Sequence, residues 1–382
     1  MSRPCCRRPV SENQAGKTPP GGLTYAASGV DIDAGDAAVV AMKDLVKSTY
    51  RPEVVGEVGG FGGLFRVPEG YQSPVLVAAT DGVGTKLAVA QTVGRLDTVG
   101  LDLVAMCVDD LVCQGAEPLF FLDYQAHGEL SPDVVVELMK GIAAGCRQAG
   151  CAILGGELAA HPGVMDPGDS DLAGFAVGIA EADRLLGDGR LVQAGDVLLG
   201  LASPGLRSNG YSLARRALLV AGGRKLDEPA WEGAGRSLGE ELLEPSVIYA
   251  PAVMRLLAAM PAGSAGVHAV AHITGGGLAA NLARVLPAGS TAVVRPGSWP
   301  VPRIFAEIQQ AGEVSDEEMA RVFNLGVGMV IALPPDVVSE AVALLAGAGG
   351  GVAGTGVGVG VTVIGEVTSC AGGSAPAVVT LP

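Results

Sequence analysis

Hydrophobic and polar positions alternate along the first half of the chain in a pattern that predicts strands and helices in turn. Residues 36–49 and 131–149 carry apolar side chains three and four positions apart, which is the spacing of an amphipathic helix. Short apolar runs of strand length lie at residues 75–80, 103–108, 119–124, 152–154 and 172–180. Because both kinds of element alternate, we expect an α/β fold with mixed sheets.

A polar stretch at residues 181–196 interrupts this pattern and has the character of a boundary between domains. The length of 382 residues also favours two domains over one. Beyond the stretch we expect strands at 197–201, 327–333 and 361–367, and helices at 210–222, 246–260, 276–285, 300–312 and 335–346. The sequence therefore predicts α/β domains at residues 23–188 and 189–369, between tails at 1–22 and 370–382.

One segment has the length of a membrane span. Residues 341–365 are uncharged and long enough to cross a bilayer. Nine of these 25 residues are glycine, which fits a helix, a flexible loop and a strand better than a membrane helix. The N-terminus is charged and lacks the apolar core of a signal peptide, so we expect a disordered tail there and no membrane anchor.

Charge and cysteine content exclude several functions. With 25 Lys and Arg against 40 Asp and Glu, the net charge is −15, so the chain lacks the basic footprint of a protein that binds nucleic acid or an anionic membrane. The seven cysteines include no C-x-x-C pair and no zinc-ligand spacing. Four of them lie in apolar surroundings, which favours buried, reduced thiols in a cytoplasmic protein.

The segment 81–86, Asp-Gly-Val-Gly-Thr-Lys, follows an apolar strand and has the composition of a phosphate-binding loop. Glycine lets main-chain N–H groups approach phosphate oxygens, and lysine adds a positive charge. Asp102, Asp109 and Asp110 follow and offer the oxygen ligands that Mg²⁺ prefers. Together these residues predict an ATP-dependent enzyme, although an ordinary glycine turn is the alternative interpretation of residues 81–86.

Three further segments carry candidate chemistry. The glycine run at 56–65 suits a loop that closes over phosphates, or a tight turn before a strand. Residues 154–163 end a strand with two glycines and Glu157, which suits a metal or nucleotide contact at a strand end. The segment 208–210, Ser-Asn-Gly, begins a predicted helix, where free N–H groups either bind an anion or are simply capped.

Nine segments carry a resemblance to a known family: GVDIDAGD (29–36), RPEVVGEVGGFGGLF (51–65), ATDGVGTK (79–86), DLVAMCVDDLVCQGAEPLFFLDY (102–124), AGFAVG (173–178), SNGYSLAR (208–215), LGEELLEPSVIY (238–249), AHITGGGLAANLARVLP (271–287) and EEMARVFNLGVGM (317–329). In this order they resemble the phosphoribosylformylglycinamidine cyclo-ligases, or AIR synthetases, of purine biosynthesis. The resemblance extends from about residue 23 to about residue 367 and leaves only the tails outside it.

The resemblance implies an activity and an assembly. The family converts formylglycinamidine ribonucleotide and ATP into aminoimidazole ribonucleotide, ADP and phosphate: ATP phosphorylates the formyl oxygen, and the amidine nitrogen then closes the ring. Its members look like homodimers whose N-terminal domains pair strands into a shared barrel, with ATP in the cleft that this barrel forms with the C-terminal domains. ATP, Mg²⁺, a small-molecule substrate and a cytoplasmic homodimer are therefore implied, without nucleic-acid or membrane partners.

The matching positions also imply site residues. Asp81, Asp110 and Glu157 are the candidates for Mg²⁺, and together with Lys43 they form the candidate catalytic set. The candidates for binding ATP are Gly59, Gly60, Phe61, Gly62, Asp81, Gly82, Gly84, Thr85 and Lys86. The candidates for facing the substrate are Arg207, Ser208, Asn209 and Gly210.

The chain departs from the family pattern at positions close to this chemistry. Glu157 is followed by Leu-Ala-Ala (158–160) where the family has Thr-Ala-Glu, and Arg207 stands where most members have histidine. His161 is a candidate substitute for the missing imidazole, with a structural role as the alternative. Two other functions therefore stay open. One is a degenerate, slow or non-catalytic paralogue that binds nucleotide or a partner. The other is an ATP-using enzyme of the same superfamily, selenophosphate-synthetase-like or thiamine-phosphate-kinase-like.

Overall fold

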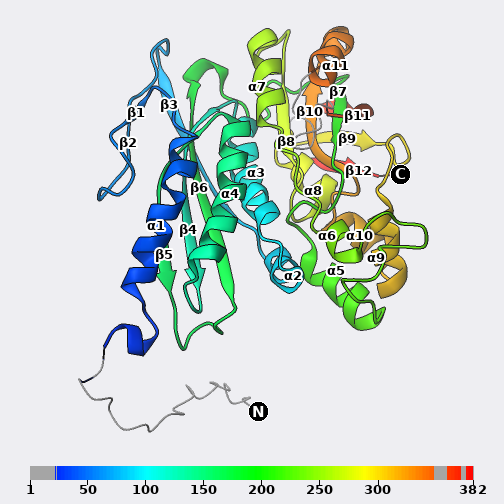
Figure 1. Ribbon diagram of the computed structural model, residues 1–382. Helices are drawn as coiled ribbons and strands as arrows, with labels where there is room; N and C mark the ends of the chain where they lie inside the picture. The colour runs from blue at the N-terminus through cyan, green and yellow to red at the C-terminus, as the bar shows by residue number, and fades with distance from the viewer. Residues whose placement is uncertain (1–21, 23, 348–358, 371–375, 382) are drawn as a thin grey trace, which may run out of the picture.

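The computed structural model describes residues 22, 24–347, 359–370 and 376–381. The chain folds into two halves, each with its own β-sheet and its own helices (Figure 1). The halves meet along helix α3 (Asp97–Cys113), which contacts strands of the first half and elements of the second. The prediction of an α/β fold with mixed sheets is confirmed.

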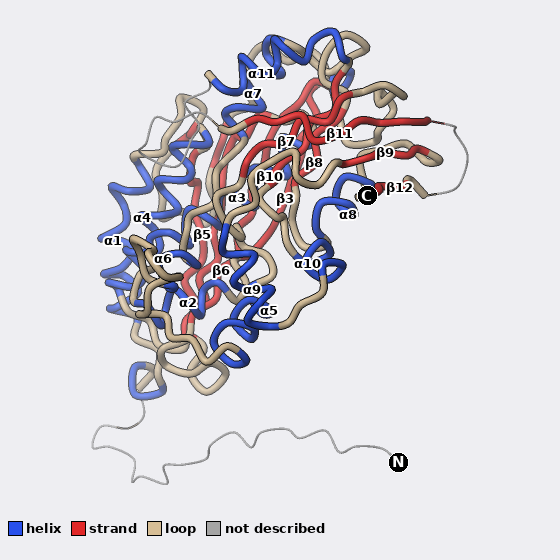
Figure 2. Tube along the Cα trace, turned by 90° about the vertical axis from the view of Figure 1, so that its right-hand side faces the viewer, coloured by secondary structure: helices blue, strands red, loops and turns tan. Residues whose placement is uncertain are grey.

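The N-terminal half contains a four-stranded sheet in the order β3-β6-β4-β5, in which β4 and β5 pair in parallel and the other neighbours are antiparallel. Helices α1, α3 and α4 pack on one face, and α1 and α4 lie side by side over the strands (Figures 1 and 2). The elements are η1 (Ala26–Ser28), α1 (Ile32–Lys47), β1 (Val54–Val55), β2 (Leu64–Phe65), β3 (Pro74–Gly82), α2 (Lys86–Val93), β4 (Glu117–His127), α4 (Pro132–Ala149), β5 (Ala152–Ala160), β6 (Ser170–Glu181) and η2 (Ala182–Arg184).

The opposite face of this sheet exposes apolar side chains. Leu76 of β3 is 63% exposed, and Tyr124 of β4 and Phe175 of β6 are each 39% exposed. Side chains alternate between the two faces of a strand, so these three residues point away from the helices that cover the other face. Exposed apolar groups gathered on one sheet face are typical of a surface that a partner covers.

The C-terminal half contains a six-stranded sheet in the order β12-β9-β11-β7-β10-β8. Its neighbours are antiparallel except for β12 and β9, which pair in parallel. The elements are β7 (Val197–Ala202), α5 (Tyr211–Arg215), η3 (Arg216–Ala221), α6 (Leu238–Leu242), α7 (Ala250–Ala259), β8 (Ala269–His272), α8 (Gly277–Ala283), β9 (Ser290–Val294), α9 (Arg303–Gly312), α10 (Asp316–Val322), β10 (Val327–Leu333), η4 (Pro335–Val337), α11 (Val338–Ala346), β11 (Val361–Cys370) and β12 (Val378–Thr380).

Local sequence explains where the helices of the N-terminal half begin and end. Asp31 caps α1 by accepting a hydrogen bond from the N–H of Ala34. Helix α4 begins with proline at its first position and ends at Gly150, which adopts the left-handed conformation. Glycine also lets α3 and α4 touch, because a Cβ atom at Gly141 would lie 1.8 Å from the carbonyl oxygen of Asp97.

The prediction of a strand at residues 103–108 is wrong, because this run lies inside α3. Almost every residue of α3 is buried, between the first sheet, α4 and the second half of the molecule. A helix that is buried on all sides has no polar stripe, so its short apolar run cannot be distinguished from a buried strand by periodicity.

The other predicted elements match the structure in kind, and five strands were not expected. They are the hairpin strands β1 and β2, together with β8, β9 and β12. The predicted tail at 370–382 is also wrong in part, because β12 adds to the sheet beside β9. The predicted N-terminal tail and most of the predicted glycine loop near 347–360 lie outside the described residues.

Two smaller predictions have clear outcomes. Among the described residues, no helix is long and apolar enough to cross a membrane. Cys107, Cys113, Cys146 and Cys151 are free and buried, which confirms the prediction of buried thiols.

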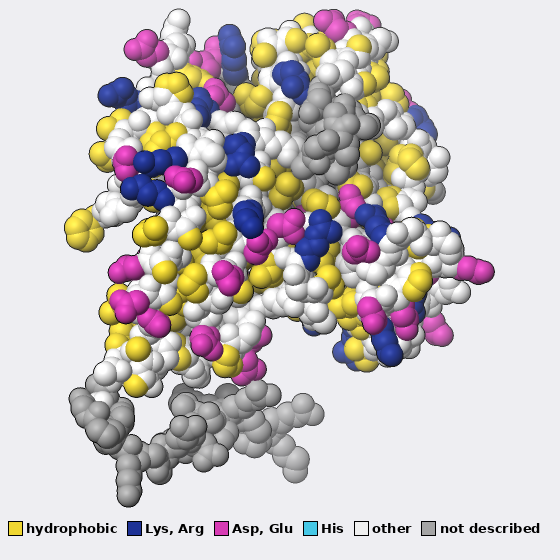
Figure 3. All heavy atoms as spheres, in the orientation of Figure 1, with side chains coloured by type: hydrophobic (Ala, Val, Ile, Leu, Met, Phe, Trp, Pro, Cys, Tyr) yellow, Lys and Arg dark blue, Asp and Glu magenta, His cyan; other side chains and the backbone are white. Residues whose placement is uncertain are grey.

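Acidic and basic side chains are interspersed over the face of the molecule that Figure 3 shows, with apolar groups between them.

Candidate active site

A cleft between the two halves is lined by edge strands of both sheets. Strand β3 ends the four-stranded sheet and β8 ends the six-stranded sheet, and α3 contacts both strands. A cavity of about 630 Å³ lies there, and its lining includes Asp110 of α3, His272 of β8 and Arg284 at the end of α8. The chemistry of this cleft therefore depends on residues that are far apart in the sequence.

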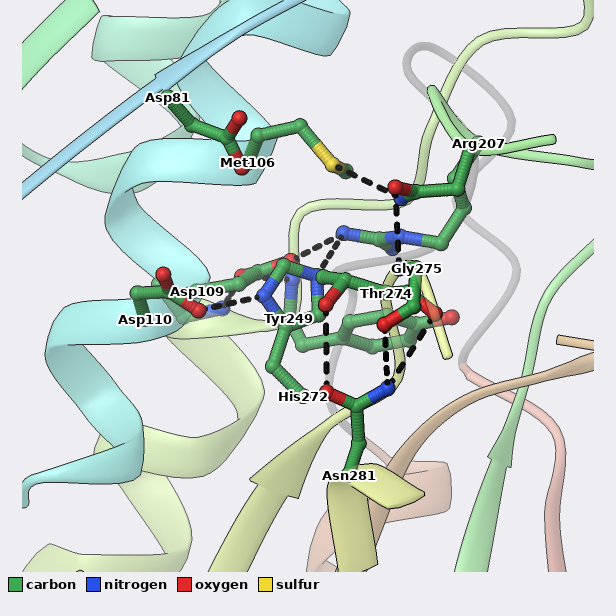
Figure 4. A network of polar contacts seen from close by, with 12 residues as sticks. Asp81, Met106, Asp109, Asp110, Arg207, Tyr249, His272, Thr274, Gly275 and Asn281 are labelled. Carbon is green, nitrogen blue, oxygen red and sulfur yellow. Dashed lines mark hydrogen bonds and ion pairs between the residues drawn. The ribbon is translucent and has the colours of Figure 1, made fainter. Parts of the chain in front are cut away.

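Of the predicted metal ligands, Asp110 lines this cleft, and Asp81 at the end of β3 lies near enough for the two charges to interact (Figure 4). Burial raises the pKa of the Asp81 carboxyl, and the negative charge of Asp110 raises it further, whereas the N–H of Gly82 lowers it by donating a hydrogen bond to Asp81. Because the two carboxylates repel each other, a cation held between them would remove an unfavourable interaction.

These carboxylates fit a hard divalent cation such as Mg²⁺. Oδ1 of Asp81 accepts from the Gly82 N–H at 2.7 Å, and Oδ1 of Asp110 accepts from Nδ1 of His272 at 2.8 Å. In each case Oδ2 makes no hydrogen bond to another described residue. The described residues include no group of three side chains that could hold a metal, so phosphate oxygens and water would complete the shell, as is usual for Mg²⁺.

Residues 207–210 lie against the turn that follows β8, next to the two aspartates. The Gly275 N–H donates to Oδ1 of Asn209 at 3.0 Å. Gly210 has a φ of 77°, and a Cβ there would lie 2.3 Å from the Phe323 ring. The hydroxyl oxygen of Ser208 is buried and has no hydrogen-bond partner among the described residues. The structure thus places the predicted substrate-facing segment against the turn that follows β8.

Arg207 itself does not present its guanidinium to solvent. Its side chain is fully buried and donates from Nη2 to Oδ2 of Asp109 at 2.7 Å and from Nη1 to the carbonyl of Val247 at 2.8 Å. The guanidinium also lies 4.8 Å from the centre of the Tyr249 ring. The structure therefore gives Arg207 an internal role and leaves it no contact with an anion in the cleft.

Lys86 is also internal. Its side chain is fully buried, its ammonium lies 2.5 Å from Oδ2 of Asp102, and it donates to the carbonyl of Glu244 at 2.8 Å. Its neighbours Gly84 and Thr85 are exposed, so the turn at 82–85 is accessible although the lysine is not. The predicted contact of Lys86 with a triphosphate therefore has no support in this arrangement, because its charge is already paired.

The glycine-rich loop lines a second cavity, on the N-terminal half. This cavity measures about 620 Å³ and is bounded by α1, the loop at 57–63 and the end of β5. Asp31, Asp36, Glu57, Asp123 and Glu157 contribute carboxyl groups to its lining, which includes no lysine or arginine. A polyphosphate bound there would need cations and main-chain N–H groups to balance its charge.

Glu157, the third predicted metal ligand, lies apart from Asp81 within one chain. In the register of the sheet, Asp81 lies opposite Gly174 of β6, and Gly174 lies opposite Asp123 of β4. Glu157 of β5 lies opposite Tyr124 of β4. Neighbouring residues of a strand point to opposite faces, so Glu157 shares the face of Tyr124 and Asp81 shares the face of Asp123. Three strand spacings of about 4.8 Å also separate them, or about 14 Å. A single chain cannot bind one cation with both groups in this arrangement.

Three other predicted or candidate residues lie at the surface of the N-terminal half. Lys43 of α1 forms an ion pair with Glu57 at 3.1 Å, beside the second cavity. Phe61 projects fully from the glycine loop, which an isolated chain leaves uncovered. His161 lies 3.4 Å from the Tyr124 hydroxyl at the end of β5, and not in the cleft with Arg207.

Asp123 is a buried carboxyl at the floor of the second cavity. Burial raises its pKa to about 6, although a hydrogen bond donated by Gln125 at 2.7 Å acts in the opposite direction. A Cβ at Gly156 would lie 2.3 Å from Oδ1 of Asp123, so glycine at this position makes room for the carboxyl group. The ionised form of Asp123 is therefore disfavoured in the folded protein.

We predict that Asp123→Asn stabilises the protein at pH 7 and has no effect at pH 3.5. Between pH 3.8, the ordinary pKa of an aspartate, and about pH 6, the unfolded chain ionises this group while the native state stays protonated. Stability is thus lost as pH rises through this window, because the unfolded state binds fewer protons. The loss is of the order of 2–3 kcal/mol. Urea unfolding of both proteins at pH 3.5, 5 and 7 measures it, and an equal difference at all three values would contradict the prediction.

One residue of the cleft, His272, was not named as a site residue from the sequence, and Asp109, which the sequence offered as an oxygen ligand for Mg²⁺, has a different partner. His272 ends β8 and hydrogen-bonds Asp110, and Asp109 accepts from Arg207. The His-Ile-Thr-Gly-Gly-Gly segment that begins at His272 and the Asp109-Asp110 pair were visible signals. Neither signal shows that the residues meet, because Arg207 is 98 positions from Asp109 and 65 from His272.

Family models match both halves of the chain. The model described as "AIR synthase related protein, N-terminal domain" matches residues 62–180, and the corresponding C-terminal domain model matches residues 193–375. A protein of Geotalea daltonii named phosphoribosylformylglycinamidine cyclo-ligase is 47% identical over 92% of this chain and 97% of its own length. A protein of the same name from Trichlorobacter lovleyi is 48% identical over 93% of this chain and 98% of its own length.

Solved structures share the fold at low sequence identity. A thiamine-monophosphate kinase from Stenotrophomonas maltophilia is 20% identical, covers 89% of this chain and 95% of its own, and has a TM-score of 0.63. The hydrogenase maturation protein HypE, solved in complex with ATP, is 18% identical over 87% of this chain and 86% of its own, with a TM-score of 0.56. At these identities the likeness supports the two-part fold alone.

Proposed function

The chain belongs to the AIR synthase related family, and from that premise we propose that it closes the imidazole ring of aminoimidazole ribonucleotide at the expense of ATP. The relatives that share almost half of its residues over their whole length carry the name of this activity. The observation that carries the proposal is that Asp110 lines the cleft between the two halves and that Asp81, at the end of β3, lies near enough for the two charges to interact. We further propose that the protein acts in the cytoplasm.

The proposed reaction has two steps. The formyl oxygen of formylglycinamidine ribonucleotide attacks the γ-phosphorus of ATP, and the bond to ADP breaks. The amidine nitrogen then attacks the formyl carbon, phosphate leaves with the oxygen, and loss of a proton from nitrogen completes the ring. Phosphorylation serves to convert a poor leaving oxygen into a good one, so the enzyme must hold the two substrates in line and exclude water.

Residues of the cleft suit these tasks. Asp81 and Asp110 would hold Mg²⁺, which when bound neutralises the charge of the phosphates. Asn209 and the turn after β8, which it holds by accepting from the Gly275 N–H, would orient the ribonucleotide. The guanidinium of Arg284, which lines the cleft and donates to Oδ1 of Asn281 at 3.4 Å, would bind its phosphate.

The glycine loop suits the polyphosphate of ATP. Gly59, Gly60, Phe61 and Gly62 are exposed and lie beside the second cavity, with Lys43 on the adjacent helix. We propose that ATP approaches this loop with its Mg²⁺, and that Glu157 takes part from β5. Because Glu157 and Asp81 of one chain are about 14 Å apart, a site that uses both would combine residues of two chains.

We also propose that the protein is a homodimer in which two four-stranded sheets form a shared barrel. The proposal is supported by Leu76, Tyr124 and Phe175, which expose apolar groups on the face without helices. Closure of two such sheets on each other would cover this face and remove its edges from solvent.

A charge on the exposed sheet face is expected to prevent dimer formation. Phe175→Glu would place a carboxylate in the centre of the proposed contact, where its burial without a partner is costly. We expect a monomer by sedimentation velocity and activity at least 10-fold lower, because the site needs both chains. Val220→Glu, on the exposed part of η3, is the matched control. A dimeric Phe175→Glu protein would rule out this interface.

The assay of ring closure tests the proposed function directly. The protein is supplied with formylglycinamidine ribonucleotide and Mg·ATP, and both phosphate and aminoimidazole ribonucleotide are measured. We expect the two products in equal amounts. Phosphate without the aminoimidazole would indicate an ATPase or a kinase-like relative, and neither product would favour a paralogue that only binds. The changes at Leu158, Ala160 and Arg207 keep that alternative open.

A further inference from the structure

Four buried or half-buried side chains form a continuous polar chain across the cleft (Figure 4). Asp109 and Asp110 of α3 lie at its ends, and Arg207 and His272 of the second half lie between them. Nη2 of Arg207 lies 2.7 Å from Oδ2 of Asp109 and 3.0 Å from Nε2 of His272. Nδ1 of His272 lies 2.8 Å from Oδ1 of Asp110.

The chemistry of arginine fixes the direction of every bond in this chain. A guanidinium has only donors, so Nε2 of His272 must accept from Arg207 and can carry no proton. The proton of the neutral ring is then on Nδ1, which donates to Asp110. Arg207 and Asp110 together therefore select one tautomer and one orientation of the imidazole.

Arg207 is itself held from several sides, so it is a rigid element. Nη1 donates to the carbonyl of Val247, and the Tyr249 ring stacks beneath the guanidinium. Its backbone has a φ of 61°, in the left-handed region that a non-glycine residue seldom adopts. Such a conformation persists only where the surrounding contacts hold it, and it is often associated with a functional site.

Asp110 is the end of the chain that reaches the cleft. Its side chain is 46% exposed, whereas the side chains of Asp109, Arg207 and His272 are almost fully buried. The hydrogen bond from His272 engages Oδ1 and so leaves Oδ2 to face the cleft. The rotation of this carboxylate is therefore set by a residue of the opposite half.

We propose that Arg207 is a positioning residue: through His272, which it fixes with Nε2 unprotonated, it orients the carboxylate of Asp110 toward the ligands of the cleft. The role assigned to Asp110 rests on the proposed function, whereas the state of His272 does not. Outer partners that orient a metal-binding carboxylate commonly change affinity or activity by about 10- to 100-fold.

A second buried ion pair shows what a purely structural role looks like. Lys86 and Asp102 join α3 to the segment 244–250, as Arg207 and Asp109 do. The ammonium of Lys86 donates to the Glu244 carbonyl, and Asp102 accepts from the Ser246 N–H. Neither of these two side chains hydrogen-bonds His272 or Asp110. The connection to His272 is thus not needed to fasten the two halves, and this pair provides a matched control.

The experiment measures the histidine rings by NMR in protein labelled with ¹⁵N-histidine. The chain has four histidines, and loss of one set of signals in His272→Gln assigns that ring. We expect the wild type to show His272 protonated at Nδ1 and unprotonated at Nε2. A wild-type ring with its proton on Nε2 would overturn the proposal without any variant.

Arg207→Lys tests the effect on Asp110. Lysine keeps the charge that Asp109 requires but lacks the planar fork that reaches Val247, Asp109 and His272 together. We expect the Nε2 signal of His272 to shift, and the affinity for Mn²⁺ with a non-hydrolysable ATP analogue to fall about 10-fold. Lys86→Gln with Asp102→Asn should lower the Tm but leave the His272 signals unchanged.

Two outcomes would refute the role of Arg207. The first is an Arg207→Lys protein that keeps both the wild-type His272 signals and the wild-type Mn²⁺ affinity. The second is a control pair that changes the His272 signals as much as Arg207→Lys does, because the effect would then follow from general loosening of the interface. Neither readout requires turnover, so failure of the proposed ring closure would be recognised separately in the product assay.

Discussion

Replacing Asp81 by Asn is expected to lower kcat by about 100-fold or more while the protein stays folded. Asparagine has nearly the same shape, but it cannot supply the negative charge that a divalent cation needs. Loss of one well-placed group that stabilises the transition state commonly costs about 10²- to 10³-fold in rate. Burial raises the pKa of Asp81, which means that its ionised form is disfavoured in the fold, so a neutral amide should not destabilise it.

Steady-state kinetics at several Mg²⁺ concentrations and urea unfolding together check this prediction. Asp183→Asn serves as the control, because Asp183 is exposed in η2 and lines neither of the two cavities described above. Full activity of Asp81→Asn would remove Asp81 from the metal site. A large loss of stability would instead assign it a structural role.

Asp109→Ala is expected to cost about 3–5 kcal/mol of unfolding free energy, the largest effect on stability that we predict. The change leaves the buried guanidinium of Arg207 without its counter-charge. It also removes the acceptor of the N–H groups of Tyr249 and Ala250 at the start of α7. Urea unfolding at pH 7 measures the loss.

A second variant separates the buried charge from lost packing. Asp109→Leu with Arg207→Met replaces the ion pair by apolar groups of similar volume, and such replacements are often neutral or stabilising. We expect the pair to recover most of the loss, less about 1–2 kcal/mol for the uncapped α7. If Asp109→Ala lost under about 1 kcal/mol of unfolding free energy, or if the double variant were as unstable as Asp109→Ala, the buried ion pair would not be important for stability.

Both buried ion pairs begin on one face of α3. Asp102 and Asp109 are seven positions apart, which is about two helical turns, so they point in the same direction. Both fasten the segment 244–250, whose N–H and carbonyl groups make a hydrogen bond to each of the four charged side chains. Asp102 and Asp109, which resemble metal ligands in the sequence, are therefore paired inside the protein, whereas Asp110 reaches the cleft.

The sequence by itself determined most of the elements. Helix α4 was predicted almost to its ends because it has one apolar and one polar side, and a glycine stops it. Strands β4 and β10 were predicted from apolar runs bounded by polar residues. The glycine loop at 56–65 and the turn at 82–85 were located by composition, since glycine reports where the backbone must turn or be approached. The collinear segments also determined the family.

Only the tertiary structure decided what surrounds each charge. The apolar run at 103–108 became part of a helix because α3 is buried on all sides, where periodicity carries no information. Lys86 was expected to meet the triphosphate and Arg207 the substrate, and they are instead paired inside the protein with Asp102 and Asp109. Their partners are distant in the chain, and a local pattern specifies a side chain's chemistry but not the group that neutralises it after folding.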